Sequence, residues 1–114
     1  MMNWIALEDI NQLEQIKTSS TPSIIFKHST RCPVSGMAKR NFQLEAPLLP
    51  EEVDVYYLDL IKYRDISSHI AEHWNIRHES PQVLLIQNGQ CSYHASHSDI
   101  ELAELVKNIS ETSG

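Results

Sequence analysis

The sequence predicts an α/β fold, with a central mixed sheet flanked by helices and elements in the order β-α-β-α-β-α-β-β-α. Three observations lead to this prediction. Short apolar runs alternate with segments of helical periodicity, an Asn-Gly pair separates the last two expected strands, and no repeat interrupts the pattern. Strands separated by helices favour parallel crossover connections, and the hairpin adds an antiparallel edge.

In the first half of the chain, two expected strands alternate with two helices. We expect a short strand over Trp4–Leu7 and a helix over Glu8–Thr18, where apolar residues recur near helical spacing. Ser23–Lys27 is a compact apolar run typical of a buried strand. Pro33 suits the first position of a helix, which the apolar spacing extends to Glu45.

The second half of the chain begins with a strand over Val53–Leu60, rich in β-branched and aromatic residues. Apolar residues four apart then predict a helix over Arg64–Trp74. Gln82–Gln87 reads as another buried strand, and Asn88-Gly89 is a hairpin signal that turns the chain into Cys91–Ala95.

A last helix is expected near the end of the chain. Ser98 is followed three residues later by Glu101, which is the pattern of a capping box. We therefore expect Ser98 to be the N-cap of a helix whose apolar stripe runs to Ile109.

Composition limits the classes of protein to consider. A chain of 114 residues with 41% hydrophobic and 21% charged residues predicts one folded domain over residues 1–114. The net charge of −6 disfavours nucleic acid as a partner, and no apolar run is long enough to span a membrane. With two cysteines and no visible signal peptide, we expect a cytoplasmic protein.

The segment that carries chemistry is Cys32–Ser35, between a predicted buried strand and a predicted helix. The first turn of a helix has unpaired backbone N–H groups and a partial positive charge. We expect Cys32 at the N-cap, where these amides stabilise the thiolate and lower the thiol pKa. Arg31 and His28 are close in sequence and add positive potential. The alternative is that Cys32 is a small buried filler of the core.

The nine residues Lys27–Ser35 resemble the active-site segment of the YtxJ-like monothiol bacilliredoxins, and His78–Gln82 is similar to that family's cis-proline segment. The resemblance covers about residues 3–110. It implies a thioredoxin-like fold and a thiol–disulfide oxidoreductase acting on mixed disulfides between proteins and bacillithiol, a low-molecular-weight thiol of some bacteria. It also implies that Cys32 is the nucleophile and that Pro81 is a cis-proline facing it.

Ser35 stands where a dithiol enzyme carries its resolving cysteine. A hydroxyl cannot attack a mixed disulfide, so we expect a cycle that needs one protein thiol. Cys32 takes the small thiol from a client protein, and a second small thiol regenerates the cysteine. Ser35 either donates a hydrogen bond to the cysteine sulfur or is a plain first-turn residue, and both interpretations stay open.

Substrate contacts are expected on both sides of the nucleophile. With Pro81 cis, Ser80 presents backbone groups with which an extended substrate pairs like an added strand. Arg31 and His28, together with the polar run Arg77–Glu79, are further candidates for contacts with a polar thiol. The alternatives are a trans proline that opens an edge strand and a solvated loop.

Neither the remaining cysteine nor the paired histidines are expected to take part in the chemistry, and the histidines are expected at solvated helix and edge positions. Cys91 follows the hairpin turn and is expected to be a buried structural cysteine, with a distal resolving role as the alternative. His69 and His73 are four apart, and His94 is near His97, but neither pair has a clear third ligand. We therefore expect no physiological metal site.

The expected partners are client proteins that carry a mixed disulfide, and the expected co-substrate is bacillithiol or a similar thiol, with no bound cofactor. One alternative is a transferase that uses glutathione or another cellular thiol. Another is an iron–sulfur cluster carrier, although Pro33 stands where the cluster-carrying monothiol glutaredoxins have glycine. A third alternative is a non-catalytic adaptor that uses the same groove.

Overall fold

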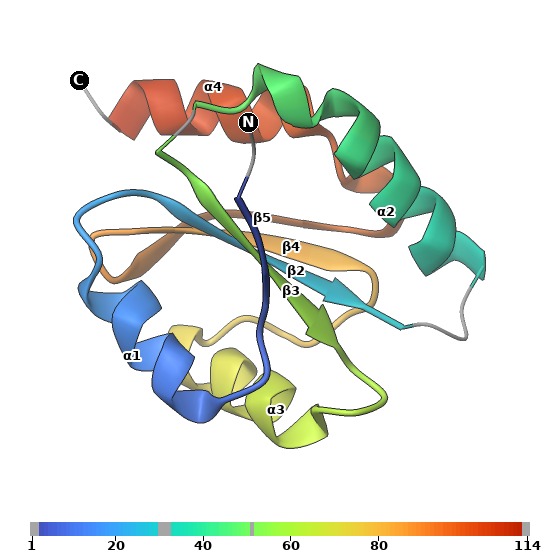
Figure 1. Ribbon diagram of the computed structural model, residues 1–114, viewed down its shortest axis with the longest axis vertical. Helices are drawn as coiled ribbons and strands as arrows, with labels where there is room; N and C mark the ends of the chain where they lie inside the picture. The colour runs from blue at the N-terminus through green and yellow to red at the C-terminus, as the bar shows by residue number, and fades with distance from the viewer. Residues whose placement is uncertain (1–2, 30–32, 51, 113–114) are drawn as a thin grey trace.

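The computed structural model describes residues 3–29, 33–50 and 52–112 (Figure 1). All the predicted helices and strands are present in the predicted order, which confirms the α/β class. The strands are β1 (Asn3–Ala6), β2 (Ser23–His28), β3 (Asp54–Asp59), β4 (Gln82–Gln87) and β5 (Gln90–Ser96). The helices are α1 (Ile10–Thr18), α2 (Pro33–Glu45), α3 (Arg64–Trp74) and α4 (Leu102–Thr112), with the short 3-10 helices η1 (Ala46–Leu48) and η2 (His97–Asp99).

The five strands form one mixed sheet in the order β1-β3-β2-β4-β5. β1 and β2 run parallel to β3, whereas β4 runs antiparallel to β2, and β5 antiparallel to β4. The expectation of a parallel crossover between β3 and β4 was therefore wrong. α3 carries the chain to the far end of the sheet, where the Trp74 indole N–H donates to the Gly89 carbonyl at 3.0 Å. Residues 75–81 then return the chain, so that β4 begins with Gln82 paired to Lys27.

Helices cover both faces of the sheet, with α2 and α4 on one face and α1 and α3 on the other (Figure 1). Every residue of β2 is buried, because both faces of this central strand are covered. Alternation along the strand sends Phe26 to the α2/α4 face and Ile25 to the α1/α3 face. No helix in the described part of the chain combines the length and the apolar character needed to cross a membrane.

α1 begins two residues later than the sequence predicts, because Asp9 caps it. The Asp9 carboxylate accepts from the Asn11 N–H at 2.8 Å, and the Gln12 side chain accepts from the Asp9 N–H at 3.0 Å. This is a capping box with aspartate and glutamine in its two positions.

The capping box predicted at Ser98 was wrong. His97 has a left-handed backbone (φ 54°), and its N–H donates to the Pro81 carbonyl at 2.9 Å. This contact turns the chain into η2, so the backbone of Ser98 lies in a separate 3-10 turn. α4 begins only at Leu102, and the carbonyl of Glu101 accepts from the Leu105 N–H at 3.3 Å.

The hairpin between β4 and β5 turns at Asn88 and Gly89, as predicted, and both have positive φ (54° and 77°). A Cβ on Gly89 would lie 2.9 Å from the Lys17 carbonyl oxygen. Because both the backbone conformation and the close approach oppose a side chain, we expect Gly89→Ala to lower the free energy of unfolding by about 1–3 kcal/mol. Urea denaturation of the two proteins measures this difference.

The matched control is Gly36→Ala, in the first half of α2. A Cβ there meets nothing within 4 Å, and the residue is exposed. Alanine is the better helix former by about 0.8–1 kcal/mol, so this variant should be as stable as the wild type or more so. Equal urea midpoints for the two alanine variants would contradict the account of Gly89.

Candidate active site

The predicted reactive segment connects a buried strand to the first turn of a helix. β2 ends at His28, and α2 begins at Pro33, which takes the first helical position as predicted. Cys32 and Arg31 lie outside the described residues. The backbone of Ser35 lies in the first turn of α2, but its side chain is outside the description as well. The roles of these three residues therefore stay predictions.

The peptide bond between Ser80 and Pro81 is cis, which confirms the expectation drawn from the resemblance. Pro81 is buried, and its carbonyl holds the turn into η2 through the N–H of His97. The next residue, Gln82, pairs with Lys27 of β2. The cis-proline loop therefore lies beside the end of β2 that leads to the reactive segment.

Glu79 and His28, two other candidates for substrate contacts, have different surroundings. The Glu79 carboxylate lies 3.7 Å from the imidazole Nε2 of His97, and both side chains are partly exposed. His28 is buried, with its ring 5.3 Å from that of Tyr57 and 6.4 Å from that of Phe26. It lies in the aromatic cluster under α2, on the opposite face of the sheet from α3. Substrate contacts by both residues stay predictions.

A buried lysine, predicted only to be part of a strand, lies on the other face of the sheet. The Lys27 side chain is 0% exposed, and its Nζ is 3.4 Å from Nδ1 of His78. The same Nδ1 is 3.1 Å from the Ser67 hydroxyl of α3. Burial lowers the Lys27 pKa to about 8. Burial and the nearby Lys27 charge also lower the pKa of His78. The sequence signal that could have pointed to this buried group is a lysine within an otherwise apolar run.

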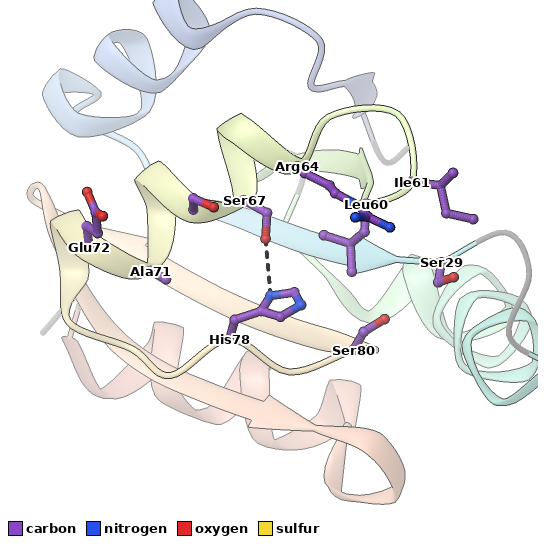
Figure 2. Close-up of a pocket in the computed structure, with 10 residues that line it drawn as sticks. Ser29, Leu60, Ile61, Arg64, Ser67, Ala71, Glu72, His78 and Ser80 are labelled. Carbon is purple, nitrogen blue, oxygen red and sulfur yellow. Dashed lines mark hydrogen bonds between the residues drawn. The ribbon is translucent and has the colours of Figure 1, made fainter.

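Next to these residues lies a cavity of about 610 Å³ between α3 and the loop that leads to the cis-proline (Figure 2). Its walls come from the end of β2, the β3–α3 connection, α3 and the cis-proline loop. They are formed by Ser29, Leu60, Ile61, Arg64, Ser67, Ser68, Ala71, Glu72, His78 and Ser80. Of the predicted substrate contacts, Ser80 lines this cavity, and Glu79 is its neighbour in the chain.

Cys91 lies at the far end of the sheet. It pairs with Ile86, which in turn pairs with Ser23 at the start of β2, whereas the reactive segment follows the end of that strand. The thiol is half-buried, and burial raises its pKa. Its Sγ donates to the Tyr93 carbonyl at 3.4 Å. These surroundings favour the structural role expected for Cys91.

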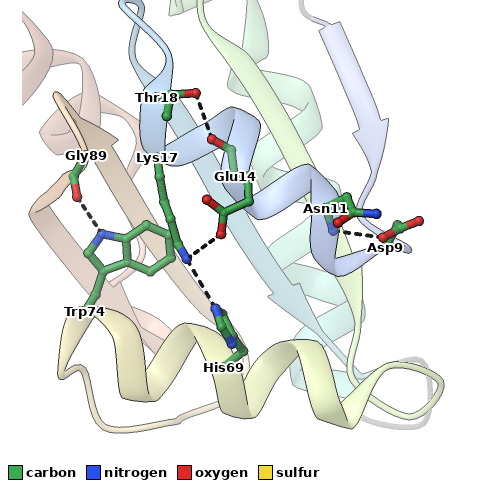
Figure 3. Close-up of polar contacts among 8 residues, drawn as sticks. All are labelled: Asp9, Asn11, Glu14, Lys17, Thr18, His69, Trp74 and Gly89. Carbon is green, nitrogen blue, oxygen red and sulfur yellow. Dashed lines mark hydrogen bonds and ion pairs between the residues drawn. The ribbon is translucent and has the colours of Figure 1, made fainter.

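The two histidines of α3, His69 and His73, contact each other, and His69 also contacts Lys17. The rings of His69 and His73 stack with centroids 6.3 Å apart, and Nε2 of His69 lies 3.2 Å from the Lys17 ammonium (Figure 3). Lys17 also pairs with Glu14 at 3.1 Å. Because an ammonium can only donate, Nε2 of His69 accepts from Lys17. Among the described residues, no three histidine, cysteine or carboxylate side chains come together as metal ligands.

The strand order, the cis-proline before β4 and the strand–helix junction before Pro33 define the thioredoxin fold. One solved structure, provisionally described as an oxidoreductase with a thioredoxin fold, is 33% identical, with a TM-score of 0.80 over 92% of each chain. A thioredoxin from Malassezia sympodialis is 20% identical, with a TM-score of 0.74 over 100% of this chain and 94% of its own. A thioredoxin from Trypanosoma brucei brucei is 14% identical, with a TM-score of 0.73 over 97% of this chain and 91% of its own.

Within this fold, the chain belongs to the family described as monothiol bacilliredoxin BrxC, whose model matches residues 5–105. Family and fold together support a thiol redox function and partners that exchange thiols.

Proposed function

We propose that this protein is a monothiol thiol–disulfide oxidoreductase that removes bacillithiol, or a similar low-molecular-weight thiol, from protein mixed disulfides. The family match carries the proposal. It is supported by the position of Cys32 in the sequence, directly before the first residue of α2. A cysteine that precedes a helix has a lowered pKa when the helix amides stabilise its thiolate.

The cycle has two exchange steps, and each conserves electrons. The Cys32 thiolate attacks the small-thiol sulfur of the client's mixed disulfide; the new disulfide joins Cys32 to the small thiol, and the client cysteine leaves as a thiolate. A second small thiol, as its thiolate, then attacks the sulfur of the small thiol held on Cys32. This step releases the small thiol as a symmetric disulfide and restores the Cys32 thiolate.

Two observations, one on Ser35 and one on Cys91, support a cycle that needs only one protein thiol. Ser35 stands where a resolving cysteine would be, and Cys91 belongs to the opposite end of the sheet. The thiol of Cys91 also has a raised pKa, which lowers its thiolate fraction near pH 7. The small thiol is therefore the resolving reagent in this proposal, and no bound cofactor is needed.

Intact-mass analysis tests the proposal. The protein is incubated with oxidised bacillithiol, digested to locate the adduct, and then treated with free bacillithiol. We expect one adduct per chain, located on Cys32 and removed by the free thiol. The absence of an adduct, or a disulfide between Cys32 and Cys91, would overturn the proposed cycle.

A further inference from the structure

The cavity beside the cis-proline loop has the size of a small-molecule site. Its volume of about 610 Å³ falls within the range of roughly 300–1,000 Å³ that ligand pockets occupy. Three stretches of the chain form its walls, residue 29, residues 60–72 and residues 78–80. Ser29 and Ser80 lie at the two strand ends nearest the reactive segment. An occupant of this cavity would therefore be a molecule of a few hundred daltons rather than a folded protein.

The charges along the cavity are separated. Arg64 and Glu72 both line it from α3, at opposite ends of the cavity (Figure 2). Eight residues of helix separate them by about 12 Å. Within the described part of the chain, Arg64 forms no ion pair with a carboxylate. The end of the cavity near Ser29 and Ser80 therefore holds an exposed guanidinium that is available to an anion.

His78 supplies a second donor on the opposite wall. Nδ1 of His78 faces the Lys27 ammonium, which can only donate, so Nδ1 accepts and the ring proton is on Nε2. The lowered pKa of His78 keeps this neutral form near pH 7. In Figure 2 the second ring nitrogen points away from Ser67, toward the end of the cavity with Leu60 and Ser80. An N–H donor and a guanidinium thus border the same end, and the Lys27 ammonium lies next to the other ring nitrogen of His78.

We propose that this cavity holds the non-reacting part of the small thiol, and that Arg64 and the Nε2–H of His78 bind a carboxylate of that thiol. The inference rests on the proposed function, in which the small thiol is the group that stays attached to the enzyme after the first step. Hydrogen bonds between a guanidinium and a carboxylate are charge-assisted and stronger than neutral ones. The substrate class is therefore a mixed disulfide whose small thiol carries a carboxylate.

The test varies the small thiol and keeps the client constant. One client peptide is prepared as its mixed disulfide with mercaptosuccinate, which is anionic, and with 2-mercaptoethanol, which is neutral. Reduction of both is measured with wild type, Arg64→Gln and Lys62→Gln. Lys62 is the matched control, because it is an exposed cation two residues before Arg64 that does not line the cavity. Comparing the variants on each substrate cancels the intrinsic reactivities of the two thiols.

We expect Arg64→Gln to lower kcat/KM for the mercaptosuccinate disulfide about tenfold, mainly by raising KM. The same substitution should change kcat/KM for the mercaptoethanol disulfide by less than about twofold. Lys62→Gln should leave both values near those of the wild type. An equal loss of kcat/KM on both substrates would overturn the inference, because it would place the Arg64 contact on the client. No loss on either substrate would also overturn it. In both cases the proposed function stands. If the wild type reduces neither substrate, the proposed function fails and this inference falls with it.

Discussion

Replacing Cys32 with serine is expected to abolish reduction of a mixed-disulfide client, with a loss of at least about 10³-fold in turnover. The reason is chemical: the proposed cycle has one nucleophile, and a serine hydroxyl neither ionises near pH 7 nor forms a disulfide. Release of a fluorescent small thiol from a labelled client protein measures the rate directly. Intact mass of the variant should show no adduct after incubation with the same client.

The matched variant is Cys91→Ser, which removes the other thiol and leaves Cys32 in place. Because Cys91 lies at the far end of the sheet and is half-buried, we expect turnover within about twofold of the wild type. Turnover retained by Cys32→Ser, or lost in Cys91→Ser while its circular dichroism spectrum is unchanged, would contradict the assignment of the nucleophile.

The second large effect is expected at Lys27, where replacement by methionine should stabilise the protein. The side chain is fully buried, and its pKa of about 8 shows that the folded state disfavours the ammonium. Methionine has a similar length and carries no charge, so we expect the free energy of unfolding at pH 7 to rise by about 1–3 kcal/mol. Lys62→Met is the control, because Lys62 is exposed and its replacement should change stability little.

The gain from Lys27→Met should depend on pH in a defined direction. The folded-state pKa of Lys27 is about 8, below the ordinary value of 10.5, so the unfolded chain binds the proton more tightly between these values. The lysine therefore destabilises the wild type fully below pH 8, and this penalty disappears as the pH rises toward 10.5. Urea denaturation should show the difference between the proteins narrowing by about 1–2 kcal/mol from pH 7 to pH 9.5. A difference that widens, or one that does not change, would contradict the buried ammonium.

Local signals in the sequence were sufficient for most of the fold. The four-residue spacing of apolar residues predicted α3 over Arg64–Trp74, and Asn88-Gly89 predicted the hairpin turn, as the structure has them. The local sequence pattern was insufficient where a contact between distant residues determines the direction of a strand or the start of a helix. The direction of β4 depends on the return path after α3, and the start of α4 depends on the contact between His97 and Pro81.

Some features of the candidate site were likewise predicted before the structure, and others were not. The strand–helix junction at Pro33 was expected from the local sequence pattern, and the cis bond before Pro81 was expected only from the family resemblance; both are present. The contact between Lys27 and His78 was not expected, because lysine is rarely buried and the two residues are 51 positions apart. The position of Arg64 on the cavity wall could not be predicted either, because three stretches of the chain, residues 29, 60–72 and 78–80, come together only in the fold to create that cavity.

The ionisation of Cys32 tests the central claim most directly. In the Cys91→Ser variant one thiol remains, and its thiolate absorbance near 240 nm can be followed against pH in the folded and the urea-unfolded protein. The account predicts a folded-state pKa below about 7.5, and a value near 8.5 in urea. A folded-state pKa at or above about 8.5 would contradict a thiolate stabilised at the start of α2, and with it the one-thiol cycle.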